Sequence, residues 1–151
     1  MYTRQQASQL RQSFWTSFGQ YMTLHSSSEG KKISWLNYKT DVKSIRFKMD
    51  VEPGSATISI EISDPDPQVQ KLYFERFLSV KNIMSSFLNE EWVWSFHIQD
   101  ENNRTISRIS RQIKGVDVFN KSDWPAIISF LKPRMIALDG FWNSVKDAFT
   151  I

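Results

Sequence analysis

Three stretches of the chain, residues 3–25, 67–88 and 122–149, place apolar side chains three or four positions apart. This spacing predicts amphipathic helices that each bury one face. Asp66 precedes the second stretch and suits the cap of its helix, because its carboxylate can accept hydrogen bonds from the first turn. In the third stretch, Pro133 is expected to bend or restart the helix.

Residues 45–62 alternate apolar and polar side chains with the period of two that is typical of a half-buried strand. The sequence EPGS interrupts the alternation at residues 52–55 and carries Pro and Gly where a turn needs them. The pattern therefore predicts a β-hairpin. A four-residue turn sets Asp50 opposite Thr57 and Arg46 opposite Glu61, so Arg46 is expected to neutralise Glu61 across the strand pair.

Three further segments are expected to be strands. Residues 32–40 and 91–98 are rich in β-branched and aromatic side chains. Residues 104–114 have apolar positions that fit a helix or a strand, and the preceding turn favours a strand. The resulting order is α-β-β-β-α-β-β-α, so residues 1–151 are predicted to form a single α+β domain with a mainly antiparallel sheet.

The composition excludes several kinds of functional site. Hydrophobic residues make up 40% of the 151 positions, which is typical of a globular core, and the absence of Cys excludes disulfides, thiolate metal sites and a thiol nucleophile. The sequence contains no apolar run long enough to span a bilayer and no secretory signal pattern, so a cytoplasmic protein with no membrane partner is expected.

Charge is unevenly distributed along the chain. The net charge is +3, but residues 1–50 carry 8 basic and 3 acidic side chains, whereas residues 51–100 carry 3 and 8. Such a basic segment could contact the phosphates of DNA, or it could be ordinary solvated surface. The candidate phosphate contacts are Lys39, Lys43, Arg46 and Lys48.

The predicted αβββαβ start resembles the core of the restriction-endonuclease-like nucleases, whose PD-(D/E)xK pattern holds Mg²⁺ between strand carboxylates beside a Lys. Asp50 and Glu61 occupy similar places, but Ser63 stands where that pattern has Lys. Only Lys48, diagonal to Glu61, could replace it. The alternative function is therefore a divergent metal-dependent nuclease with Asp50 and Glu61 as Mg²⁺ ligands and Lys48 assisting water, while the leading interpretation has no catalytic residue and no cofactor.

Aromatic residues make up 14% of the chain. Trp92, Trp94 and Phe96 alternate on one predicted strand, where they could pack in the core or form a stacking platform for bases. Aromatic side chains are also enriched at protein interfaces, so a self-associating module is a further alternative.

Segments quoted from across the chain together carry a resemblance to a family: FWTSFGQYM, RFKMDVEPGSATISIEISDPD, YFERF and DWPAIISFLKPRMIALDGFW. They are similar to the bacterial domain of unknown function 4268. Members occur alone or attached to larger, sometimes nuclease-like proteins, so the resemblance implies a context of DNA or of a nucleic-acid-processing partner and assigns no functional residues. We interpret the chain as a non-enzymatic accessory or binding domain with a nucleic-acid-associated role.

Overall fold

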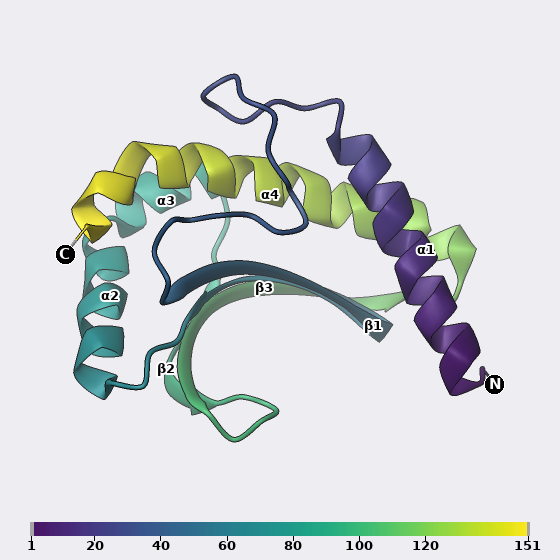
Figure 1. Cartoon of the computed structure of the whole chain (residues 1–151), viewed down its shortest axis with the longest axis horizontal. Coiled ribbons are helices and arrows are strands. Elements are labelled where there is room, and N and C mark those ends of the chain that lie inside the picture. Colours follow the sequence, from purple (N-terminus) through teal and green to yellow (C-terminus); the bar gives the residue numbers. More distant parts are fainter. Residues whose placement is uncertain (1, 151) are drawn as a thin grey trace.

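The computed structural model describes residues 2–150 and shows an α+β fold (Figure 1). One face of a curved antiparallel sheet is covered by the long helix α4 (Trp124–Val145). Helix α1 (Arg4–Met22) crosses one end of the sheet, and α2 (Pro67–Ser79) stands at the other end. Core side chains come from the helices and from the apolar face of the sheet.

Helix α1 confirms the first predicted helix. Thr3 and Gln6 form a capping box, in which the Gln6 amide donates to Thr3 Oγ1 and the Thr3 amide donates to Gln6 Oε1. The buried side chains Phe14, Phe18 and Met22 are four residues apart, so they lie on one face of the helix.

The extended element β1 (Ile45–Ile62) doubles back on itself and confirms the predicted hairpin. The Ser63 amide donates to the Ser44 carbonyl over 2.8 Å, which joins residues just outside its two ends. The backbone reverses at Pro53 and Gly54, and Gly54 has a φ of 107° that favours glycine. This register is the one predicted from the sequence, because Ser44 opposite Ser63 implies Asp50 opposite Thr57.

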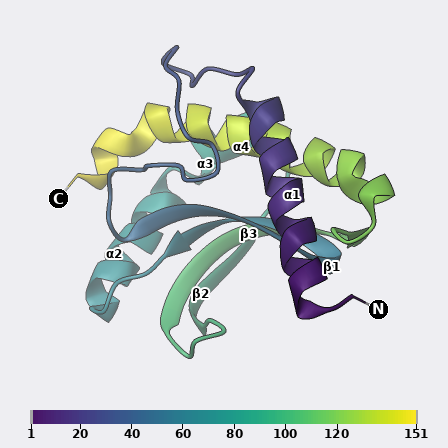
Figure 2. The ribbon, with the colours of Figure 1, turned by 45° about the vertical axis from the view of Figure 1, so that its right-hand side comes forward.

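The returning half of β1 pairs with β3 (Thr105–Asp117), and β3 pairs with β2 (Val93–Gln99), so the sheet order is β1-β3-β2. Both pairings are antiparallel. Residues 105–114 are thus strand, as the preceding turn predicts. The β2–β3 hairpin curls away from α4, so the sheet is concave on its second face (Figures 1 and 2).

The predicted strand at residues 32–40 is wrong. These residues belong to a long connection between α1 and β1 that contains no helix or strand. The inward side chains of this segment are Ile33, Trp35, Tyr38 and Thr40, and the step of three residues between Trp35 and Tyr38 breaks the period that a strand requires. The αβββαβ order of the restriction-endonuclease-like core is therefore not confirmed.

The helical regions differ from the prediction at two points. The second helix is divided at Val80 into α2 and α3 (Lys81–Leu88), with Asp66 capping α2 by accepting from the Gln68 amide. Helix α4, by contrast, passes through Pro133 without ending. The expectation that Pro133 restarts the helix is wrong, and the buried apolar face of α4 extends on both sides of it.

Candidate functional site

The concave face of the sheet carries a buried carboxylate between two cations. Glu61 is only 4% exposed, and its Oε2 lies 3.3 Å from Lys48 Nζ and 3.8 Å from Arg108 Nη2. Lys48 comes from the first half of β1 and Arg108 from the opposite position on β3. The two cations therefore neutralise Glu61 from both neighbouring strands, where diagonal partners are within reach of long side chains.

Arg46 does not fill the role expected of it. It lies opposite Glu61 in the hairpin register but its side chain is exposed, and the ion pairs of Glu61 go to Lys48 and Arg108. The reason is burial. Lys48 and Arg108 are each partly shielded from water, so their electrostatic attraction to Glu61 is stronger than that of an exposed Arg46 would be. The sequence indicated Lys48 as a diagonal neighbour but gave no signal for Arg108.

Asp50 lies on the same face, two residues after Lys48. Partial desolvation raises the pKa of Asp50 above its ordinary value, against the attraction of Lys48 and with added repulsion from Glu52 and Glu101. Asp50 is opposite Thr57, four residues along the returning strand from Glu61. Within residues 2–150, no three Asp, Glu, His or Cys side chains gather so as to hold a metal ion.

A groove of about 590 Å³ opens where the two ends of β1 meet the starts of α2 and β3. Lys43 and Arg104 line it from different parts of the chain, together with the hydroxyl-bearing residues Ser44, Ser63 and Thr105. The Arg104 side chain is 68% exposed, although its Nε contacts Asp100 Oδ2 at 3.3 Å. The groove thus presents two basic groups beside several small polar ones.

Asp64 places one negative charge in this groove. The Ser44 hydroxyl donates to Asp64 Oδ2 over 2.6 Å, and the Asp66 amide donates to Oδ1. These hydrogen bonds lower the pKa of Asp64, so its carboxylate stays ionised. The buried Gln70 closes the floor by donating to the Asp64 and Thr105 carbonyls.

The four phosphate contacts expected from the sequence lie at different places. Lys43 lines the 590 Å³ groove, and Lys48 is engaged by Glu61. Arg46 is exposed beside the free edge of β1, and Lys39 lines a separate hollow of about 390 Å³ between the long connection and α4. The structure adds Arg104, which directly precedes β3 and which the sequence pattern did not distinguish from the basic residues of that strand.

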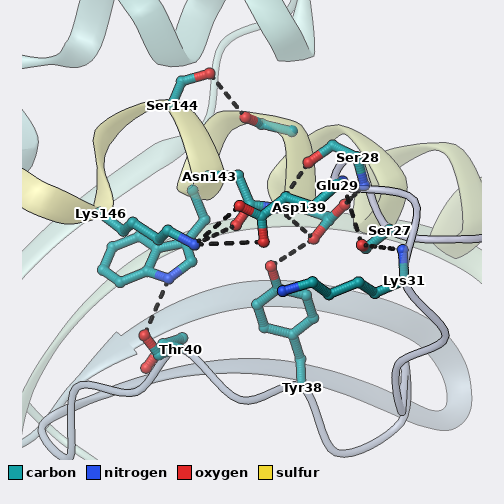
Figure 3. Close-up of polar contacts among 12 residues, drawn as sticks. Ser27, Ser28, Glu29, Lys31, Tyr38, Thr40, Asp139, Asn143, Ser144 and Lys146 are labelled. Atoms are coloured by element: carbon teal, nitrogen blue, oxygen red, sulfur yellow. Dashed lines mark hydrogen bonds and ion pairs between the residues drawn. The ribbon is translucent and has the colours of Figure 1, made fainter.

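The 390 Å³ hollow is built around a buried acid that sequence reasoning missed (Figure 3). Asp139 of α4 is 1% exposed. Its Oδ1 accepts from the Tyr38 hydroxyl over 2.6 Å and from the Asn143 side-chain amide over 3.1 Å, and its Oδ2 accepts from the Ser28 backbone amide over 2.6 Å. Three donors therefore compensate the burial of the carboxylate.

These contacts explain how a connection without regular structure keeps one conformation. Ser28 and Tyr38 belong to the segment between α1 and β1, while Asp139 belongs to α4, so the carboxylate fastens the segment to the helix layer. Nearby, the Trp142 indole donates to the Thr40 carbonyl over 3.1 Å. Burial raises the pKa of Tyr38 well above its ordinary value, and the hydrogen bond to Asp139 raises it further.

The three aromatic residues around β2 do not form a uniform platform. Trp92 is buried, and its indole donates to Glu90 Oε2 over 2.8 Å. Trp94 is half-buried, while Phe96 is 43% exposed, and both pack edge-to-face on Phe74 of α2. Trp92 therefore belongs to the core, whereas the side chain of Phe96 is partly exposed to solvent.

These features define an α+β domain with a polar concave sheet face and a basic groove at one end of it. The chain belongs to the family described as domain of unknown function DUF4268, which it matches over residues 10–146. An uncharacterised protein of Methanocaldococcus jannaschii is 26% identical over 72 residues, a stretch that covers 48% of this chain and 16% of that protein. No solved structure matches the chain. No helix within residues 2–150 has the length and apolar character needed to cross a membrane.

Proposed function

We propose that this domain is a non-enzymatic accessory domain that binds nucleic acid through phosphate contacts at the 590 Å³ groove. The observation that carries the proposal is that Lys43 and Arg104, from different parts of the chain, line one groove together with Thr105, whose hydroxyl is a further hydrogen-bond donor. Arg and Lys are the usual partners of phosphate oxygens, and such contacts position a nucleic acid without reading its sequence.

The charges around Glu61 support binding over cleavage. A metal bound through Glu61 Oε2 would have to displace Lys48 and Arg108, which both contact that oxygen. Burial strengthens these contacts relative to exposed ion pairs. In this interpretation Lys48 and Arg108 stabilise the sheet, and the more exposed Lys43 and Arg104 bind the nucleic acid.

A divergent metal-dependent nuclease is the second candidate. It rests on the position of Lys48. The Lys48 Nζ lies 3.3 Å from Glu61 Oε2 and on the same face of the sheet as Asp50. Lys48 is also the one residue that could replace the Lys missing from the PD-(D/E)xK pattern. In that case Mg²⁺ would be held by Asp50 and Glu61, and Lys48 would assist the attacking water.

The proposal is tested by fluorescence anisotropy with labelled duplex and single-stranded DNA over a range of salt concentrations. Two phosphates neutralised by Lys43 and Arg104 predict a slope of log K against log salt of about −2 for duplex DNA. Lys43→Glu and Arg104→Glu should each weaken binding at least several-fold. Lys121→Glu makes the same charge change at an exposed position beyond the other end of β3 and should leave binding close to that of the wild type.

Two results would contradict the proposal. One is the absence of binding at low salt and micromolar protein. The other is an equal loss of affinity in Lys121→Glu and Lys43→Glu, because overall charge rather than the groove would then determine binding.

A further inference from the structure

β2 forms one outer edge of the sheet. It pairs with β3 on one side, and no other strand of residues 2–150 pairs with its second side. Helix α2 covers one face of the sheet at this end, where its Phe74 packs edge-to-face on Trp94 and Phe96 of β2. The contact with α2 is made by side chains on the face of the sheet, whereas a further strand would pair at the edge, in the plane of the sheet.

The backbone of this edge has hydrogen-bonding groups directed outward. In an antiparallel ladder, alternate residues bond to the strand on one side. Counting from the Ser63–Ser44 bond through the registers of β1 and β3, Val93 and Ser95 direct their groups toward β3. Trp94 and Phe96 consequently direct their N–H and C=O groups away from the sheet.

The side chains of the edge lack the usual protection against pairing. β2 has the sequence VWSFHIQ, with no Asp, Glu, Lys or Arg, and Val93 is 63% and Phe96 43% exposed. Sheet edges are commonly protected by charged residues, because unpaired strands are templates for further strands. The irregularity between Ser95 and Ile98, where His97 has a φ of 48°, limits regular pairing to residues 93–96.

We propose that this edge is the contact surface for a second copy of the chain, with the two β2 strands antiparallel about a two-fold axis at Ser95. In this register Trp94 lies opposite the partner's Phe96, and Phe96 opposite the partner's Trp94. Both outward-directed residues then exchange backbone hydrogen bonds, and two aromatic cross-strand pairs form on one face.

The self-complementary pattern of the strand is what selects a second copy as the occupant. An axis at Phe96 would set Trp94 opposite the partner's Ile98, and an axis at Trp94 would set Phe96 opposite the partner's Trp92, which precedes β2 and is buried. Only the axis at Ser95 pairs Trp94 with Phe96 on both sides. The isologous contact uses the same surface on both chains, as in most closed dimers. It joins the two sheets into one and covers the exposed side of Phe96. Phe74 of α2 packs on both aromatic residues, and Leu78 lies one helical turn further along α2. Leu78 is 46% exposed, so it adds apolar surface beside the contact.

Sedimentation of the full chain over a range of concentrations tests the association. The wild type should form dimers at high micromolar concentration, and Phe96→Lys and Val93→Lys should each shift it to monomer, because each places charge on the contact. Leu24→Lys changes an 80% exposed apolar residue of the α1–β1 connection and should leave the dimer intact. A monomeric wild type at high micromolar concentration would overturn the proposal.

The register has its own test, because the chain contains no Cys. On the proposed axis the two Ser95 residues form a non-hydrogen-bonded pair with Cα atoms about 4.5 Å apart, within the range that a disulfide spans. Ser95→Cys should therefore form a covalent dimer under mild oxidation, and Gln99→Cys, away from the axis, should not. Equal cross-linking of both variants, or of neither, would overturn the register at Ser95.

Discussion

Tyr38 and Asp139 lie 101 positions apart in the chain, yet the Tyr38 hydroxyl donates to Asp139 Oδ1 over 2.6 Å. The contact joins an irregular segment to the middle of α4 (Figure 3). Because Asp139 is 1% exposed, the donors around its carboxylate take the place of water as hydrogen-bond partners. The fold of the α1–β1 connection and the stability of the domain are therefore linked at this carboxylate.

Tyr38→Phe should destabilise the domain by about 1–3 kcal/mol, because it removes one donor to a buried carboxylate and keeps the ring. Urea unfolding followed by tryptophan fluorescence measures the loss. Tyr21→Phe provides the control, since Tyr21 is 53% exposed and its hydroxyl should contribute little. Equal stability of the two variants would show that the Tyr38 contact does not hold the connection.

Alkaline pH should weaken the wild type through the same group. The pKa of Tyr38 is raised in the folded state by burial, by its hydrogen bond to Asp139 and by nearby negative charge, whereas an unfolded Tyr titrates near about 10. The stabilisation is thus fully present below that pH and is lost as pH rises toward the folded pKa, at up to about 1.4 kcal/mol per pH unit. Tyr38→Phe should show a shallower decline than the wild type above that pH, and parallel declines would contradict the assignment.

Much of the fold could be predicted from local pattern, and the hairpin shows why. Strict alternation on both sides of Pro53 and Gly54 fixes which residues face the core, and the turn fixes the register. The segment at residues 32–40 has a similar composition, but its conformation depends on Asp139, more than 90 residues later. No local signal in the sequence connects the two.

The site was only partly predictable for a related reason. Lys48 could be placed as a diagonal neighbour of Glu61 because both belong to one hairpin, whose register the sequence specifies, although Arg46 was the ion-pair partner expected. Arg108 reaches the same face, and Arg104 reaches the groove, only through the pairing of β1 with β3, and two helices and another strand separate these two strands in the chain. Such long-range pairing is not encoded in the spacing of residues along either strand.

Acid should weaken the contact between Glu90 and Arg134. Arg134 donates from Nε and Nη2 to the two carboxylate oxygens, each over 2.8 Å. Burial opposes ionisation of Glu90, but the hydrogen bonds from Arg134 and Trp92 outweigh it and lower its pKa. This contribution is present above the ordinary Glu pKa of about 4.3 and is lost as pH falls through the lowered value.

Glu90→Gln should therefore reduce stability at neutral pH and flatten its decline in acid. Thermal unfolding of the wild type and the variant from pH 7 to pH 3 measures both effects. Glu75→Gln is the matched control, because its ion pair with Lys71 is more than half exposed on both sides. An unchanged acid profile in Glu90→Gln would contradict the role of this pair.

Glu61→Gln distinguishes a structural role of Glu61, as the ion-pair partner of Lys48 and Arg108, from a catalytic role as a metal ligand. The substitution preserves shape but removes the charge that faces Lys48 and Arg108, so we expect a loss of about 1–3 kcal/mol in unfolding free energy. DNA affinity should stay within a few-fold of the wild type, because the proposed phosphate contacts lie at the groove. A large loss of affinity in a folded Glu61→Gln protein would place the ligand on the concave face instead.

The central claim, that the domain binds nucleic acid and does not cleave it, is tested most directly by one gel assay. End-labelled duplex DNA is incubated with the purified wild type, Asp50→Ala and Glu61→Gln, each with Mg²⁺ or Mn²⁺, and is analysed for both shift and cleavage. The account predicts shifted, intact DNA with all three proteins. Metal-dependent cleavage by the wild type that is lost in both Asp50→Ala and Glu61→Gln would contradict it and establish the carboxylates as a metal site.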